Sequence, residues 1–75
     1  MSISDILIHV NESLTDQQQA TLEASMREID GVVAPRFTPG RQHLMLVAFD
    51  PEATSTAELL SRVRSFGYNA QLVGA

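Results

Sequence analysis

The side chains of this sequence that could hold a metal ion are two histidines and nine carboxylates, because cysteine is absent. His9 is followed closely by Glu12 and Asp16, and His43 is the second histidine. Imidazole nitrogen and carboxylate oxygen suit Cu(II), Ni(II) or Zn(II), whereas Cu(I) prefers soft thiolates. A metal site at His9, Glu12 and Asp16, with His43 as a further ligand, is therefore one hypothesis. A thiolate-bound soft metal is not expected.

Strand parity argues against a site that joins both histidines. Residues 5–10 alternate in the period of two that is typical of a strand with one buried face, and His9 falls on the uncovered parity. His43 shares its parity with Met45, which we expect to face the core. The two rings are predicted to lie on opposite sides of the sheet unless a bulge turns one of them. Isolated surface histidines are the expected arrangement.

Catalysis would need a nucleophile with a base, a pair of carboxylates in a cleft, or a bound ion, and the sequence brings no such set together. Met26 and Met45 fall at predicted core positions, so we interpret them as core filling and not as thioether ligands for copper. We therefore expect no enzymatic activity and no cofactor.

A basic segment gives a second candidate site. Residues 31–49 contain no acid, and Arg36, Arg41 and His43 lie in this segment. Arginine offers a planar pair of donors to a carboxylate or phosphate, so these side chains could contact an anionic partner. The alternative is ordinary solvated charge around a turn.

The elements that would position these residues follow from periodicity and turn residues. We predict strands at residues 5–10, 32–38, 43–49 and 68–73, with Pro35 confining the second strand to a sheet edge. A helix over residues 16–29 begins at a Thr15 and Gln18 capping box, although Ser13 with Asp16 is a competing start.

The second predicted helix begins at a Ser55 and Glu58 capping box and carries a buried stripe of Leu59, Val63 and Phe66 before Gly67. The order strand, helix, strand, strand, helix, strand predicts an α+β fold of the ferredoxin-like kind. In this βαββαβ fold, two helices cover one face of a four-stranded antiparallel sheet. With 75 residues, the chain is expected to form a single domain over 1–75.

Several of these segments resemble heavy-metal-associated domains. The resemblance is carried by Val47-Ala48-Phe49-Asp50-Pro51-Glu52, Ser55, Leu59-Leu60, Val63 and Gly67-Tyr68-Asn69-Ala70 in the second half, and by Leu22-Glu23, Met26 and Gly31-Val32 in the first. It covers nearly the whole chain, and the order and spacing of these short motifs are more specific than any one of them. The resemblance implies the ferredoxin-like fold.

That family carries a G-M-x-C-x-x-C segment between the first strand and the first helix, where two thiolates bind a soft ion such as Cu(I). The resemblance places Glu12 and Ser13 on the Gly-Met pair, and Thr15 and Gln18 on the two cysteines. A hydroxyl and a carboxamide are neutral oxygen donors, so soft-metal affinity does not carry over. Thr15 and Gln18 are either a helix cap or the remnant of a loop that binds an anion at a helix start.

The uncovered side of the predicted sheet is apolar, whereas such a side is normally polar. Its apolar residues are Leu7, Leu44, Leu46, Ala48 and Val73. We expect these residues to form a protein interface, most simply in a two-fold homodimer. A bulge, or coverage by Gly74-Ala75, is the alternative explanation.

The net charge of −4, with five arginines and no lysine, argues against nucleic acid as a partner. The sequence has neither a membrane-spanning apolar run nor a secretory signal, so a cytoplasmic protein without membrane insertion is expected. The leading hypothesis is a non-catalytic interaction module that binds itself or another protein. The alternatives are a metal chaperone or sensor that uses histidine and carboxylate ligands, and a carrier of an anion or small ligand.

Overall fold

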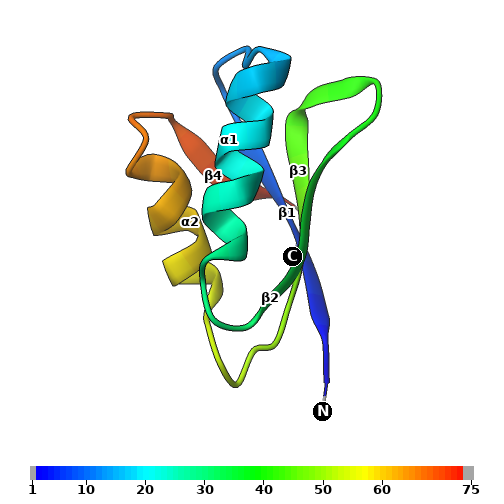
Figure 1. Cartoon of the computed structure of the whole chain (residues 1–75), viewed down its shortest axis with the longest axis vertical. Helices are drawn as coiled ribbons and strands as arrows, with labels where there is room; N and C mark the ends of the chain where they lie inside the picture. Colours follow the sequence, from blue (N-terminus) through cyan, green and yellow to red (C-terminus); the bar gives the residue numbers. More distant parts are fainter. Residues whose placement is uncertain (1, 74–75) are drawn as a thin grey trace.

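Six elements follow one another in the order strand, helix, strand, strand, helix, strand (Figure 1). The computed structural model describes residues 2–73. The strands are β1 (Ser4–Val10), β2 (Val32–Thr38), β3 (Arg41–Phe49) and β4 (Ala70–Val73), and the helices are α1 (Asp16–Arg27) and α2 (Thr56–Arg64). The predicted α+β, ferredoxin-like βαββαβ fold is thereby confirmed.

The four strands form one sheet in the order β2-β3-β1-β4, in which all neighbours are antiparallel. Leu7 of β1 lies at the centre of the register, opposite Leu46 of β3 on one side and Val73 of β4 on the other. The edge position predicted for the strand that contains Pro35 is confirmed, because β2 pairs with β3 alone.

The outer edge of β2 is closed to a further strand. Proline has no N–H to donate, and the backbone N–H of Phe37 donates to Oε2 of Glu23 in α1 over 2.8 Å. Helix α1 packs against β2, which brings the Glu23 carboxylate to this edge. Since an unpaired edge invites strand addition, Pro35 and Glu23 together remove two donors that a new strand would use here.

Both helices begin with the side-chain caps that the sequence predicts, but only the first capping box is complete. Oγ1 of Thr15 accepts from the N–H of Gln18, and Oε1 of Gln18 accepts from the N–H of Thr15. In α2, Oγ of Ser55 accepts from the N–H of Glu58 over 3.1 Å. The Glu58 carboxylate does not return the bond; it accepts from the hydroxyl of the buried Thr54 over 3.0 Å.

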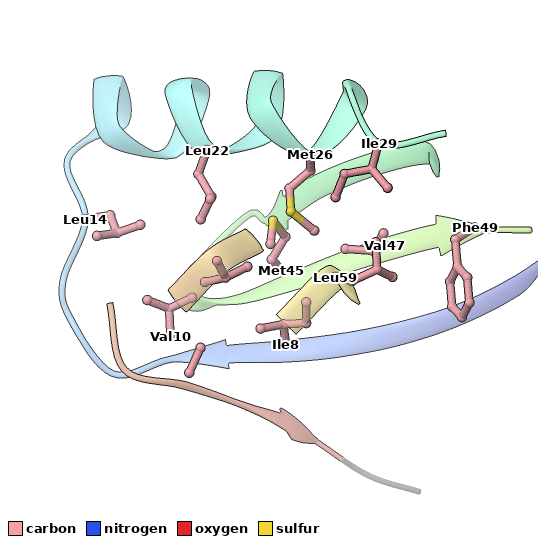
Figure 2. Packing of buried hydrophobic residues seen from close by; sticks show 12 residues of the cluster. Ile8, Val10, Leu14, Leu22, Met26, Ile29, Met45, Val47, Phe49 and Leu59 are labelled. Atoms are coloured by element: carbon pink, nitrogen blue, oxygen red, sulfur yellow. The ribbon is translucent and has the colours of Figure 1, made fainter. Parts of the chain in front are cut away.

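The two helices cover one face of the sheet and enclose a single cluster of buried side chains (Figure 2). Leu22 and Met26 point from α1 toward the strands, while Ile8 and Val10 point from β1 toward the helices. Met26 and Met45 are fully buried in this cluster, as predicted. Arg62 of α2 ties the two helices together by donating to the backbone and side-chain oxygens of Ser25, each over 2.9 Å.

Phe66 corrects the predicted core. It was expected on the buried stripe of the second helix, yet its side chain is 38% exposed. The reason is that α2 ends at Arg64, so Phe66 lies in the following turn, where it stacks on Tyr68 with ring centroids 5.9 Å apart. The turn closes at Gly67, whose φ of +88° lies in the left-handed region.

The remaining differences in bounds are small. Helix α1 ends at Arg27 and not at Ile29, although Ile29 is still buried in the turn that follows. Strand β3 begins at Arg41, two residues before the predicted start, and β4 begins at Ala70, two residues after it. Helix ends fray and strand ends depend on pairing, which periodicity alone does not fix.

Gly31 allows a close approach between the end of α1 and the loop before α2. Its φ is +98°, and a Cβ built on it would lie 2.7 Å from the Cβ of Ala53. Gly67 is a matched control, because its φ of +88° is similar but a Cβ there would meet nothing within 4 Å. We expect Gly67→Ala to cost about 1–3 kcal/mol of stability from backbone strain alone.

Gly31→Ala adds steric overlap to the same strain and should cost at least about 1 kcal/mol more. Urea unfolding followed by circular dichroism measures both free energies. Equal destabilisation by the two substitutions would show that the contact with Ala53 relaxes freely, contrary to this account.

Candidate functional site

The side of the sheet away from the helices, called the open face below, carries the apolar residues that the sequence placed there. Leu7, Leu46 and Val73 lie in one row across β1, β3 and β4, while Ala48 pairs with Asp5 and Leu44 pairs with His9. Val73 is 39% exposed and the other four residues are half-buried. These five residues are thus brought onto one surface, and their role as an interface stays a prediction. The alternative involving Gly74-Ala75 lies outside the described residues.

Polar side chains surround this apolar centre. Register places Arg36 of β2 beside Leu46, and Asp5 beside Ala48. His9 and Gln71 pair with each other at the far end of β1 and β4. Sequence reasoning missed Ala34, which lies opposite Ala48 because a register shift follows Val32; no local signal in the sequence marks that irregularity.

A hollow of about 510 Å³ lies around β1 and β4, beside the start of α2. Leu7, Leu46 and Val73 of the open face contribute to its wall together with Asp5, but Ile6, Leu72 and Thr56 also line it, so the hollow extends past the open face. The lining is therefore mainly apolar, and an apolar side chain is what it would accept from a partner.

The loop between β1 and α1 does not fit a metal. Thr15 and Gln18 occupy the positions at which the resemblance places thiolates. The side-chain oxygen of each accepts a hydrogen bond from a backbone N–H in the capping box. Neither oxygen is soft or charged, so the donor chemistry is wrong for Cu(I). The sequence left open whether these residues form a helix cap or the remnant of an anion-binding loop, and in the structure they form the helix cap.

Glu12, proposed as an oxygen ligand, is also engaged. Its carboxylate accepts from the backbone N–H of Asn69, with oxygens at 2.9 and 3.1 Å, and from the Asn69 side chain over 2.9 Å. These bonds join the loop after β1 to the turn before β4. Asp16 lies in the first turn of α1, where a negative charge stabilises the helix. No three metal-ligating residues come together anywhere in residues 2–73, so the predicted set of His9, Glu12 and Asp16 is not assembled.

The two histidines do come together, so the prediction that their rings lie on opposite sides of the sheet is wrong. The rings of His9 and His43 stack with centroids 5.6 Å apart and planes inclined by 20°. The pairing of β1 with β3 ends at His9 and Leu44, so His43 lies one residue beyond the paired ladder. Its ring turns to the carbonyl of Val10, to which Nδ1 is 2.8 Å away, because no further pairing holds it on the helical side.

A second hollow, of about 420 Å³, lies beside this pair. His9, Arg41, His43 and Leu44 are among its lining residues. Arg36 is not, because it lies in the middle of β2, beside Leu46 and away from the hairpin end. The basic group of Arg36, Arg41 and His43 predicted from the sequence is therefore divided between two places.

Comparison with known proteins gives a likeness in structure only. No family model matches the chain, and a search of curated proteins finds no match. Among solved structures, oxidized MerP from Ralstonia metallidurans CH34 superposes with a TM-score of 0.85 at 18% identity, covering 97% of this chain and all of the other (100%). The N-terminal domain of a potential copper-translocating P-type ATPase from Bacillus subtilis, in its Cu(I)-loaded state, gives 0.87 at 18% identity over 97% of this chain and 90% of that one.

The CopZ metallochaperone gives a TM-score of 0.81 at 16% identity, covering 91% of this chain and 100% of its own. The chain has the fold of a heavy-metal-associated domain. The resemblance in sequence is thereby confirmed as a resemblance in fold. This heavy-metal-associated fold contains no cysteine, and no helix in residues 2–73 is long and apolar enough to cross a membrane.

The contact between Glu12 and Asn69 makes stability depend on pH. Partial desolvation raises the pKa of Glu12, but hydrogen bonds from the Asn69 backbone, its own backbone and the Asn69 side chain outweigh this effect and bring the pKa below its ordinary value of 4.5. A carboxyl whose pKa is lower in the folded state stabilises the fold above pH 4.5, and this contribution is lost as pH falls through the folded pKa.

We expect Glu12→Gln to lower the unfolding free energy at neutral pH, with a deficit that shrinks as the pH falls below 4.5. Unfolding in urea over a pH series measures the deficit, and Glu52→Gln in the loop before α2 is the charge-matched control. A deficit that stays constant into acid would contradict a lowered pKa.

Proposed function

We propose that this chain is a non-catalytic interaction module that associates with a second copy of itself through the open face. The observation that carries the proposal is the row of Leu7, Leu46 and Val73 in the middle of a sheet side that no helix covers in the described part of the chain. An apolar centre with a polar rim is the usual anatomy of a protein interface.

Other surfaces are less suited to self-association. Pro35 and Glu23 close the β2 edge to strand pairing. The two helices carry charges of both signs, with the acids Asp16, Glu23 and Glu58 and the arginines Arg27, Arg62 and Arg64, and charged residues are depleted from the core of protein interfaces. Asp5 is the only acid in the four strands described, so repulsion between two open faces is small.

The open face carries one negative and one positive side chain, so the charges of one copy can complement those of a second copy. Asp5 and Arg36 lie on different strands, on either side of β3, and both are exposed. A two-fold axis between two open faces matches a patch with a copy of itself, so each Arg36 can meet the Asp5 of the other copy. One acid and one base on the same patch therefore favour a second copy over a strongly charged partner.

The size of the open face predicts a weak association. Four strands about 4.8 Å apart with about 20 Å of paired length give roughly 400 Å² per copy, or about 800 Å² in total. If half of this area is apolar, burial contributes about 10 kcal/mol at about 25 cal/mol per Å². Association itself costs about 4–15 kcal/mol, so the two terms nearly cancel. We expect an equilibrium between monomer and dimer that shifts with concentration.

Leu46→Asp places a charge in the apolar centre of the proposed contact and should weaken self-association at least about tenfold, because burying a charge is costly even beside Arg36. Sedimentation equilibrium over a concentration series measures the constant. Phe66→Asp is the matched control, since it changes an exposed apolar residue on the helical side.

Circular dichroism checks that both variants fold, and Leu46→Thr, which keeps a strand-forming residue, serves if Leu46→Asp does not fold. A wild-type chain that stays monomeric at every concentration contradicts the proposal. Equal weakening by Leu46→Asp and Phe66→Asp does so too.

The charge pattern is tested by mixing variants. Arg36→Asp alone and Asp5→Arg alone each give a face with two like charges and should dimerise less than the parent. An equimolar mixture should form a heterodimer, because each copy then offers what the other lacks. Exposed pairs contribute about 0.2–1 kcal/mol each, so two pairs predict a gain between about twofold and thirtyfold over either variant.

Sedimentation at low ionic strength measures the mixture against the two separate variants. If the mixture shows no preference for the heterodimer, the proposed contact between Arg36 and Asp5 is wrong. If the contact is electrostatic, high salt should abolish the preference.

Metal handling is the second candidate function. It is favoured by the stacked pair of His9 and His43, together with a fold shared with proteins named for copper transport and metallochaperone activity. Here it would not use Thr15 and Gln18, which form the helix cap. The absence of nucleic acid as a partner, a cytoplasmic location and a role as a carrier of an anion or small ligand remain predictions. So do anion or partner contacts at Arg36, Arg41 and His43.

A further inference from the structure

We propose that His9 and His43 form a two-imidazole site for a divalent transition-metal ion, with Cu(II) the best-fitting ion, at the rim of the open face. The proposal rests on metal handling as the second candidate function and names its site, and it does not depend on self-association. The site lies between β1 and β3, away from the β1 to α1 loop where the resemblance would place a metal.

The tautomer of His43 is fixed in the form that a metal needs. Its Nδ1 lies 2.8 Å from the carbonyl oxygen of Val10. A carbonyl can only accept, so Nδ1 carries the proton and Nε2 of the neutral ring is left with its lone pair. A backbone carbonyl on one ring nitrogen is the arrangement that commonly orients a metal-ligating histidine through the other.

His9 is also engaged at Nδ1, but its contacts do not fix the tautomer. This atom lies 3.1 Å from Oδ1 of Asn11 and 2.9 Å from Nε2 of Gln71, and Gln71 also donates to Asn11 over 3.1 Å. One ring nitrogen cannot donate to Asn11 and accept from Gln71 at the same time. Binding a cation at Nε2 selects the tautomer in which Nδ1 donates to Asn11. The amide pair thus supplies His9 with the outer support that Val10 supplies to His43.

The orientation of the rings requires a small rotation. Centroids 5.6 Å apart suit two imidazoles that bind one ion at about 2.0 Å, but planes inclined by only 20° do not aim both Nε2 lone pairs at one position, so one ring must rotate. His9 is the ring that moves, since its partners are exposed side-chain amides, whereas His43 is held by the backbone and is half-buried. The neighbouring hollow of about 420 Å³ leaves room for the water ligands that complete the coordination.

The donor set selects the ion. Two neutral imidazoles with water suit Cu(II), Ni(II) and Zn(II), and affinity for such ligands is greatest for Cu(II). Cu(I) is disfavoured because it prefers thiolate. Arg41 also lines the hollow, and its positive charge works against any cation, so binding should strengthen moderately when Arg41 is neutralised.

The test is a titration of the full chain with Cu(II) alone, followed by electron paramagnetic resonance. We expect one Cu(II) per chain with hyperfine coupling to two imidazole nitrogens. His9→Gln and His43→Gln should each weaken binding about ten- to a hundredfold, and the double variant should lose it. Arg41→Gln is the control that keeps both ligands and should bind no more weakly than the parent.

Each other outcome overturns the site. Coupling to a single nitrogen, or weakening by only one of the two substitutions, means a lone imidazole. Unchanged Cu(II) binding in the double variant would rule out this site but would leave metal handling at another site. Failure of the parent chain to bind Cu(II) would rule out both the site and metal handling.

A measurement without metal tests the preorganisation. Two-bond ¹⁵N correlation spectra of the metal-free chain should show His43 protonated at Nδ1, and Zn(II) should shift the ring signals of His9 and His43 together. A His43 ring protonated at Nε2 would contradict the proposal.

Discussion

Two helices on one side of a four-stranded sheet are the constraint on which everything else in this molecule depends. They bury Ile8 and Val10 of β1 together with Met45 and Val47 of β3, and by the alternation of strands they turn Leu7, Leu44 and Leu46 to the other side. None of the elements described in residues 2–73 lies on that side. The apolar open face is a direct consequence of this arrangement.

The β1 to α1 loop keeps its place in this fold without thiolates. In this chain the β1 to α1 loop is held by protein contacts alone: Thr15 and Gln18 cap α1, and Glu12 binds Asn69 before β4. Both contacts satisfy backbone donors that would otherwise be left free at a helix start and a turn. The loop offers no thiolate, and oxygen acceptors hold it in place.

Much of this arrangement could be predicted from the sequence, because period and caps are local signals. Thr15 with Gln18 marked the start of α1, Pro35 marked the edge strand, and strand parity placed Leu7 and Leu46 on the open face. The failures lie where local rules end. Phe66 follows the last helical turn, so helical period no longer applies to it, and His43 lies beyond the last residue pair of β1 and β3, so a hydrogen bond to Val10 and not parity directs its ring.

The central claim is that the open face meets a second copy of the chain, and an isotope-filtered nuclear Overhauser experiment tests it most directly. Labelled and unlabelled chains are mixed at high concentration, and only contacts between copies give signals. The account predicts cross-peaks between the methyl groups of Leu7, Leu46 and Val73 of different copies. Cross-peaks confined to the helical side, or none at a concentration where dimer is present, would contradict it.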